Sequence, residues 1–71
     1  MAKVKVGDRY LEYMVPFKGK YFSWEYEVKG FHSEPYGEFA DCERVFRDGK
    51  RESVGISVEL LEEEIFYKKV A

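Results

Sequence analysis

The sequence contains only one cysteine, Cys42, one histidine, His32, and two prolines among its 71 residues. A lone cysteine excludes a disulfide within the chain, and without a signal-like N-terminus it favours a reducing, cytoplasmic location. No segment approaches the roughly 20 apolar residues that a membrane-spanning helix needs. The length predicts one domain, residues 1–71, which has to be stabilised by its apolar core rather than by cross-links.

Catalytic and metal-binding patterns are also missing. The segment His32-Ser33-Glu34 is contiguous, whereas the side chains of a catalytic triad converge from separate elements. One histidine and one cysteine, with acidic residues at no ligand spacing, do not make a zinc site. We therefore expect no catalytic residue, no cofactor and no metal, and we predict that the protein is not an enzyme.

Aromatic residues, by contrast, are abundant: six Phe, six Tyr and one Trp make up 18% of the chain. Each ring buries about 150–250 Å², so a few of them can build a core in a short chain. The clearest pattern is the segment Tyr21–Lys29, in which polar residues alternate with Phe22, Trp24, Tyr26 and Val28. A period of two is typical of a strand with one buried face, so the pattern predicts an antiparallel sheet over a single core.

Turn residues divide the rest of the chain into further elements. The expected strands besides Tyr21–Lys29 are Arg9–Val15, Glu38–Phe46, Lys50–Ser57 and Ile65–Val70. The expected loops are Pro16–Lys20, a hairpin connection, and Gly30–Gly37, the longest irregular stretch. A helix of two turns at most is expected from Val58, with Ser57 as its N-cap and with Val58, Leu61 and Ile65 facing inward.

The register of the hairpin between Glu38–Phe46 and Lys50–Ser57 follows from its side-chain pattern. A two-residue turn at Asp48-Gly49 would place Val54 opposite Glu43 and mix apolar with acidic residues on one face. A three-residue loop instead pairs Cys42 with Val54, Ala40 with Ile56, and Arg44 with Glu52. Gly49 then takes the left-handed position that this loop requires. We expect the three-residue loop, with Cys42 packed inside as a small apolar residue.

The order of these elements resembles that of SH3-like small barrels, in which a short helical turn connects the fourth and fifth strands. The segments Lys5-Val6-Gly7-Asp8-Arg9-Tyr10 and Ile56-Ser57-Val58-Glu59-Leu60-Leu61 also resemble small phage and bacterial proteins of this type. The resemblance implies an all-β, five-stranded SH3-like small barrel with one short helix before the last strand. It is compatible with a phage-encoded factor that binds a host protein, and it transfers no functional residue.

More rings are present than the core of so small a barrel can hold. The surplus comprises Tyr10, Phe17, Tyr21, Phe31, Tyr36, Phe39 and Tyr67. Aromatic side chains, and Tyr above all, are enriched at protein interfaces. We therefore predict a protein-interaction module of unknown partner whose binding residues are Tyr10, Phe17, Phe31 and Tyr36; the alternative is that these rings only cap the ends of the barrel.

A second functional hypothesis rests on the lysines of the first half of the chain. Residues 1–30 carry six basic against four acidic side chains, and residues 31–71 carry six against ten. Aromatic rings beside a basic groove are typical of proteins that bind single-stranded nucleic acid. The net charge of −2 and the interrupting Glu12, Glu25 and Glu27 argue against it. An open barrel would also leave an edge strand through which a homo-oligomer could form.

Overall fold

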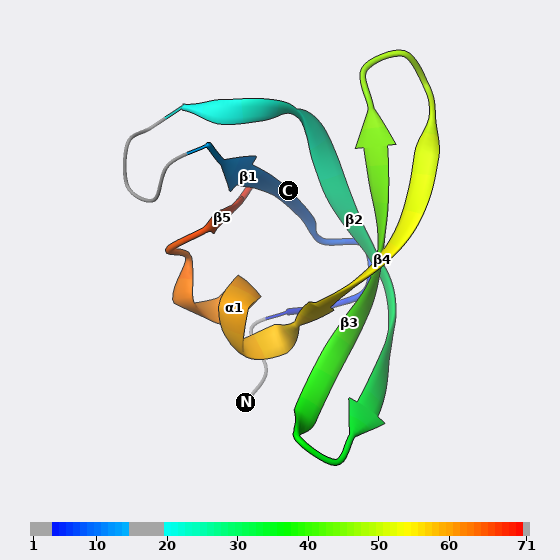
Figure 1. The fold of residues 1–71 in the computed structure, drawn as a ribbon, viewed down its shortest axis with the longest axis vertical. Coiled ribbons are helices and arrows are strands. Elements are labelled where there is room, and N and C mark those ends of the chain that lie inside the picture. The colour runs from blue at the N-terminus through cyan, green and yellow to red at the C-terminus, as the bar shows by residue number, and fades with distance from the viewer. Residues whose placement is uncertain (1–3, 15–19, 71) are drawn as a thin grey trace.

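The protein is described by a computed structural model that covers residues 4–14 and 20–70 (Figure 1). Five strands and one helix follow one another as β1 (Arg9–Tyr13), β2 (Tyr21–Glu34), β3 (Gly37–Phe46), β4 (Arg51–Ser57), α1 (Val58–Glu63) and β5 (Tyr67–Lys69). All neighbouring strands are antiparallel and lie in the order β4-β3-β2-β1-β5. The expected mainly β class, with five strands and one short helix before the last, is confirmed.

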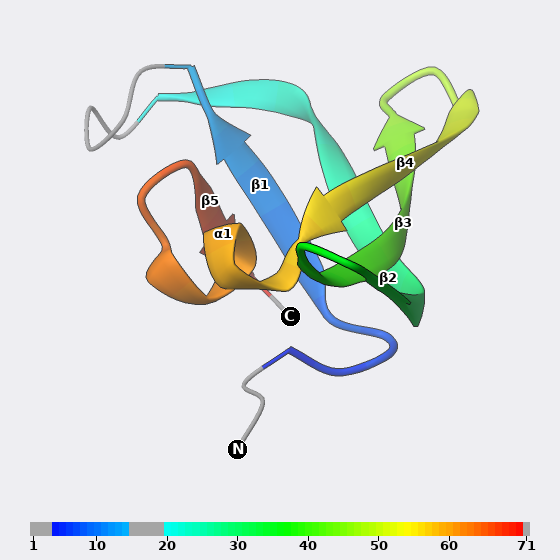
Figure 2. The same ribbon diagram turned by 60° about the horizontal axis from the view of Figure 1, so that its bottom comes forward.

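The sheet is curved but is not closed into a barrel, which corrects the expected architecture. β4 and β5 are the two edges of the sheet, and α1 contacts β3, β4 and β5. In Figures 1 and 2 the strands bend around α1, which lies on the concave side. The helix thus covers the core where further strand pairing would otherwise have closed it. The resemblance to SH3-like proteins remains a prediction.

The core lies between the concave face of the sheet and α1. The buried side chains come from the N-terminal segment, from β1 to β4 and from α1: Val4, Tyr10, Tyr26, Val28, Ala40, Cys42, Ile56, Val58 and Leu61. Residues that pair directly across antiparallel strands share a face, so these contacts define one face of the sheet. We call it the core face, and the opposite side the outer face.

Tyr10 belongs to this core, which contradicts its assignment to an exposed binding surface. It pairs with Tyr26 across β1 and β2, and only 2% of it is exposed. Burial, with a smaller contribution from Asp8, raises the pKa of Tyr10 to about 12. The ring was counted as surplus because β1 is short and its alternation is less regular than that of β2. Conversely, Phe22 and Trp24, which we expected in the core, are only partly buried.

The segment expected as a long loop is instead the end of a hairpin. β2 continues to Glu34, and Glu34 pairs with Gly37, so only Pro35 and Tyr36 form the turn. Proline suits the first central position of a tight turn because its ring fixes φ near −65°. The expectation of a loop at 30–37 was wrong because Gly30 lies beside a β-bulge and does not end the strand: the register shifts between Val28 and Gly30.

The β3–β4 hairpin has the register that its side-chain pattern predicts. Cys42 pairs with Val54, Ala40 with Ile56, and Arg44 with Glu52. Gly49 has a φ of +93°, and its amide donates to the carbonyl of Phe46 at 3.0 Å. The three-residue loop is therefore confirmed, and so is the burial of Cys42.

The helix has the expected start and length, whereas the last strand is shorter than expected. α1 ends at Glu63, and Glu64 takes a left-handed conformation with a φ of +56°. Ser57 is the N-cap residue but makes no side-chain capping hydrogen bond. Val58 and Leu61 face inward as predicted, whereas Ile65 lies beyond the helix and is half-buried. With so few backbone hydrogen bonds, α1 depends on its packing rather than on its own propensity.

Two neighbouring leucines of α1 provide a matched test of this dependence. Leu61 is 1% exposed and Leu60 is 37% exposed. We expect Leu61→Ala to lower the free energy of unfolding by about 2–5 kcal/mol, because it removes a fully buried side chain. Leu60→Ala should change it by less than about 1 kcal/mol. Urea denaturation of both variants measures the difference; equal losses would show that α1 does not cover the core.

Candidate interaction surfaces

Four residues with ring side chains lie at the end of the hairpin where β2 ends and β3 begins. We call this group, Phe31, His32, Tyr36 and Phe39, the hairpin tip. The ring of Tyr36 meets that of Phe39 edge-on, with centroids 5.5 Å apart, and the ring of His32 stacks on Phe39 at 5.6 Å. Tyr36 is 78% exposed and Phe31 is 39% exposed. Figure 1 shows this end of the β2–β3 hairpin projecting beyond α1. The tip therefore offers aromatic surface that the core does not use.

The bulge in β2 decides which way the tip side chains point. Before it, Val28 pairs with Cys42; after it, Phe31 pairs with Ala40 and His32 with Phe39. One extra residue in one strand exchanges the faces that all later residues occupy. Phe31 consequently lies on the core face beyond Ala40, while His32 lies on the outer face. Without the bulge, the ring of Phe31 would be on the outer face.

His32 is held by polar contacts on the outer face. Its Nδ1 lies 2.7 Å from Oδ1 of Asp41, and its Nε2 lies 3.7 Å from Oε1 of Glu34. A shallow hollow of about 510 Å³ adjoins the ring and is lined in part by Lys29, Ser53 and Gly55. The carboxylates orient the imidazole against Phe39, which fixes one wall of the tip. The negative side chains also give the tip an acidic surround.

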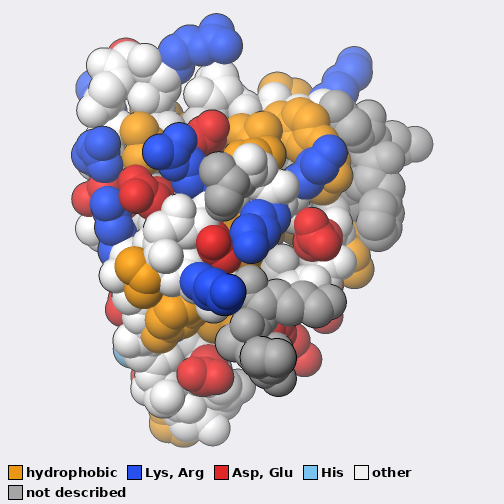
Figure 3. All heavy atoms as spheres, turned by 180° about the vertical axis from the view of Figure 1, so that it is seen from behind, with side chains coloured by type: hydrophobic (Ala, Val, Ile, Leu, Met, Phe, Trp, Pro, Cys, Tyr) orange, Lys and Arg blue, Asp and Glu red, His pale blue; other side chains and the backbone are white. Residues whose placement is uncertain are grey.

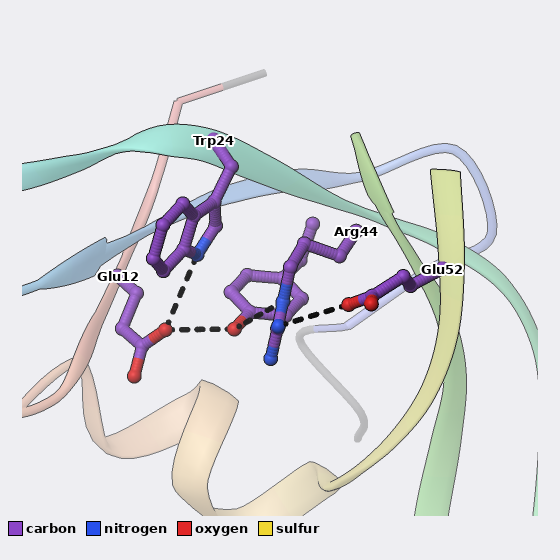
Figure 4. Close-up of polar contacts among 5 residues, drawn as sticks. Glu12, Trp24, Arg44 and Glu52 are labelled. Carbon is purple, nitrogen blue, oxygen red and sulfur yellow. Dashed lines mark hydrogen bonds and ion pairs between the residues drawn. The ribbon is translucent and has the colours of Figure 1, made fainter. Parts of the chain in front are cut away.

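A second set of aromatic and charged side chains lies on the core face, at the end that is farther from the tip. We call this set, Glu12, Trp24, Tyr26, Arg44 and Glu52, the Arg44 cluster (Figure 4). Tyr26 donates its hydroxyl hydrogen to Oε1 of Glu12 at 2.7 Å, and Trp24 Nε1 donates to the same oxygen at 3.4 Å. Arg44 donates from Nε to the Tyr26 hydroxyl at 3.1 Å and from Nη1 to Glu52 at 3.0 Å.

The guanidinium group of Arg44 also lies over aromatic rings. Its central carbon is 5.4 Å from the ring centroid of Trp24, 5.3 Å from that of Tyr26 and 5.8 Å from that of Phe46. A cation over ring faces at these distances is attracted by the ring quadrupoles. Burial, together with the bond to Glu12, raises the pKa of Tyr26 to about 12, so its hydroxyl stays protonated. The cluster thus joins β1, β2, β3 and β4 at the open end of the core.

The Arg44 cluster leaves part of its rings accessible. Phe22 and Trp24 are stacked, with centroids 4.4 Å apart and planes 6° from parallel. They line a shallow hollow of about 420 Å³ together with Phe46 and Arg47. The pairing of β1 with β2 is irregular at this point: Leu11 pairs with Glu25 and Tyr13 pairs with Tyr21, so three residues of β2 lie opposite Glu12 alone. Phe22 and Trp24, which lie in this irregular segment, are half-buried.

Charges on the outer face and along β1 are largely paired with one another. Lys29 lies 3.3 Å from Glu27, Arg9 lies 4.0 Å from Glu25, and Lys69 lies 3.4 Å from Asp8. Arg51 bonds to Glu43 across β3 and β4. In the space-filling view of Figure 3, basic and acidic side chains are interspersed, with no broad basic area on that face. Of the lysines in the first half, Lys29 is thus paired with a neighbouring carboxylate.

Of the four predicted binding residues, two lie at the same end of the β2–β3 hairpin, Phe31 on the core face and Tyr36 in the turn against Phe39. Phe31 and Tyr36 lie at the hairpin tip and are exposed, whereas Tyr10 is in the core. Phe17 lies outside the described residues. The sequence did not point to His32 and Phe39 as their neighbours, because their contacts depend on a strand register that includes the bulge. The contact of His32 with Asp41, nine residues further along the chain, also has no local sequence pattern that would predict it.

Some kinds of site have no candidate in the described part of the chain. Within residues 4–14 and 20–70, no group of three His, Cys, Asp or Glu side chains is placed to hold a metal ion. No helix within those ranges has the length and the apolar character needed to cross a bilayer. Comparisons of the chain with protein-family models, with curated proteins and with solved structures found no match.

Cys42 offers a chemical test of core burial at the centre of β3. Burial raises the pKa of its thiol from 9.0 to about 11, and the thiolate is the reactive form. We therefore expect the folded protein to react with a thiol reagent at about pH 8 far more slowly than the urea-unfolded protein. Cys42 is the only cysteine, so the signal reports this site alone. Equal rates in the two states would contradict its burial.

The same raised pKa has a consequence for stability at alkaline pH. Folded Cys42 holds its proton more tightly than the unfolded chain does, so its contribution is complete below pH 9.0 and is lost toward about pH 11. Cys42→Ala should therefore show a smaller fall in unfolding free energy across that range than the wild type. Parallel curves for the two proteins would contradict the assignment.

Proposed function

We propose that the protein is a small protein-interaction module that binds its partner through the hairpin tip. The observation that carries the proposal is the exposure of Tyr36 and Phe31 on a paired hairpin that projects beyond the core. A ring on a paired strand, such as Phe31, or in a two-residue turn, such as Tyr36, loses less conformational freedom on binding than a ring on a long loop does. Such aromatic anchors, set in a partner's pockets, dominate many interfaces.

The negative charge around the hairpin tip indicates which kind of protein the partner is. The acidic side chains Glu34, Glu38 and Asp41 lie in the same part of the hairpin, and no lysine or arginine occurs between residues 30 and 43. Complementary charge steers association and excludes partners of like charge. The proposed partner is therefore a protein with an apolar pocket and a basic rim. The specific form that we propose is a cytoplasmic, non-enzymatic, phage-encoded factor that binds a host protein, and the resemblance is compatible with that origin.

Substitutions at the tip test the proposal. We expect Tyr36→Ala and Phe31→Ala to weaken binding to the partner by about tenfold or more each, since interface aromatics cost 2 kcal/mol or more when truncated. Phe66→Ala is the matched control, because Phe66 is similarly exposed, at 42%, but lies between α1 and β5. The partner would be recovered by affinity capture, purified, and titrated calorimetrically with each variant.

Stability has to be measured beside affinity. Both tip variants should keep the wild-type unfolding free energy to within about 1 kcal/mol, because the side chains are exposed. If either variant unfolds the protein, the ring belongs to the core and the surface assignment fails. If the Phe66 variant weakens binding as much as the tip variants do, the tip is not the site.

A second candidate function is favoured by the stacked Phe22–Trp24 pair and by Arg47 at the adjoining hollow. Rings that stack on bases beside a cation are a recurrent means of holding single-stranded nucleic acid. The pairing of Arg9, Lys29, Arg51 and Lys69 with carboxylates weighs against it. Phosphate neutralisation normally supplies much of such affinity.

Trp24 is the only tryptophan, so its fluorescence tests this candidate directly. Base stacking on the Phe22–Trp24 pair should quench the emission when single-stranded DNA is added at low salt. The quenching should be reversed at about 200 mM salt, because counterion release weakens phosphate contacts. An unchanged emission, with no gel shift of the DNA at low salt, would eliminate the nucleic-acid function.

A further inference from the structure

The two edges of the sheet differ in how they are protected against pairing with another strand. An edge strand presents unpaired N–H and C=O groups, and proteins usually protect it by shortening it, by charges, by proline or by a bulge. β5 has only three residues, and two of them are lysines. β4 has seven residues, and its pairing with β3 shows no bulge. β4 is thus the edge with the capacity to accept a strand.

The middle of β4 also lacks protective side chains. Its charged residues, Arg51 and Glu52, lie at the start, and the following five, Ser53 to Ser57, carry neither charge nor proline. On the core face this segment presents Val54 and Ile56, of which Val54 is only half-buried. On the outer face it presents Ser53, Gly55 and Ser57. An uncharged strand of this kind can add a partner strand without burying an unpaired charge.

The sequence of β4 is complementary to itself in one antiparallel register. A two-fold axis at Gly55 places Val54 opposite Ile56 of the second copy and Ser53 opposite Ser57, each pair occurring twice. Apolar side chains then meet on the core face and hydroxyls on the outer face, as favourable cross-strand pairs do. An axis at Val54 would instead oppose Glu52 to Ile56, and an axis at Glu52 would oppose two carboxylates. The Gly55-centred register avoids both, and it alone pairs all five uncharged residues, Ser53 to Ser57, with one another.

We infer that the free edge of β4 pairs with the β4 of a second copy of this chain, antiparallel and centred on Gly55. The two sheets then form one continuous sheet of ten strands, since each copy contributes five. The strands run in opposite directions across the axis, so the two hairpin tips lie at opposite ends of the assembly. The inference concerns a surface separate from the tip and does not depend on the proposed function.

The dimer is expected to be weak. The paired segment spans only five residues, so we expect the interface to bury much less than the roughly 800 Å² per partner that stable interfaces bury. We therefore expect a dimer at a protein concentration of about 1 mM and a monomer at about 1 µM. Sedimentation equilibrium across this range measures the association constant. Amide signals that shift on dilution should lie in Ser53–Ser57 and not in β5.

Gly55 allows a sharp test because a side chain fits there in the monomer. Its φ lies outside the left-handed region, and the nearest atom to an added Cβ is Cε1 of His32 at 3.9 Å, an ordinary contact. In the proposed dimer residue 55 faces its own copy, so Gly55→Lys and Gly55→Glu should each weaken self-association by about tenfold or more. An equimolar mixture of the two variants should form a heterodimer, because Lys then faces Glu.

Gly30→Lys is the matched control. Gly30 lies in β2, away from the edge, and its added Cβ would meet only Oδ2 of Asp41 at 3.9 Å. This variant should associate as the wild type does. The inference is overturned if the wild type is monomeric at about 1 mM, if Gly30→Lys weakens association as much as the Gly55 variants, or if the mixture stays monomeric. Concentration-dependent amide shifts of the wild type outside β4 would overturn it without any variant.

Discussion

One extra residue in β2 determines how the two halves of the molecule differ. Between Val28 and Gly30 the strand carries a bulge, and the pairing with β3 continues on both sides of it. Up to Val28 the alternation places rings and aliphatic side chains in the core. Beyond it the faces are exchanged, so Phe31 continues the core face while His32 turns outward against Phe39 and Asp41. One end of this 14-residue strand therefore contributes side chains to the core, and its other end contributes side chains to an exposed surface.

The core itself is small, and its open end is closed by polar contacts instead of apolar packing. α1 contributes Val58 and Leu61 to the same buried cluster as Ala40 and Ile56, and Tyr26 links that cluster to the Arg44 cluster. There the cation of Arg44 lies against three rings and is bonded to Tyr26 and Glu52. Such an arrangement buries part of a charge without leaving it unpaired, which would otherwise be costly. The sheet can therefore remain open without exposing the ends of its core rings.

Much of the fold follows from periodicity and turn chemistry, but the bulges do not. The alternation of Tyr21–Lys29, the three-residue loop ending at Gly49 and the inward positions of Val58 and Leu61 are local signals, and the structure bears them out. The continuation of β2 past Gly30 was missed because glycine there resembles a loop signal. The burial of Tyr10 is not visible in the sequence because it depends on β2 and α1, which lie far along the chain. Of the candidate site, only Phe31 and Tyr36 were found, since His32 and Phe39 join them through the bulge.

The register on the two sides of Lys29 is the most direct test of this account. Cross-strand nuclear Overhauser effects between backbone protons report which residues face each other. The structure predicts Val28 with Cys42 and Phe31 with Ala40, and no partner for Lys29 between them. Contacts of Lys29 with Asp41 and of Phe31 with Phe39 would mean that β2 has no bulge. The ring of Phe31 would then lie on the outer face, and the hairpin tip described above would not exist.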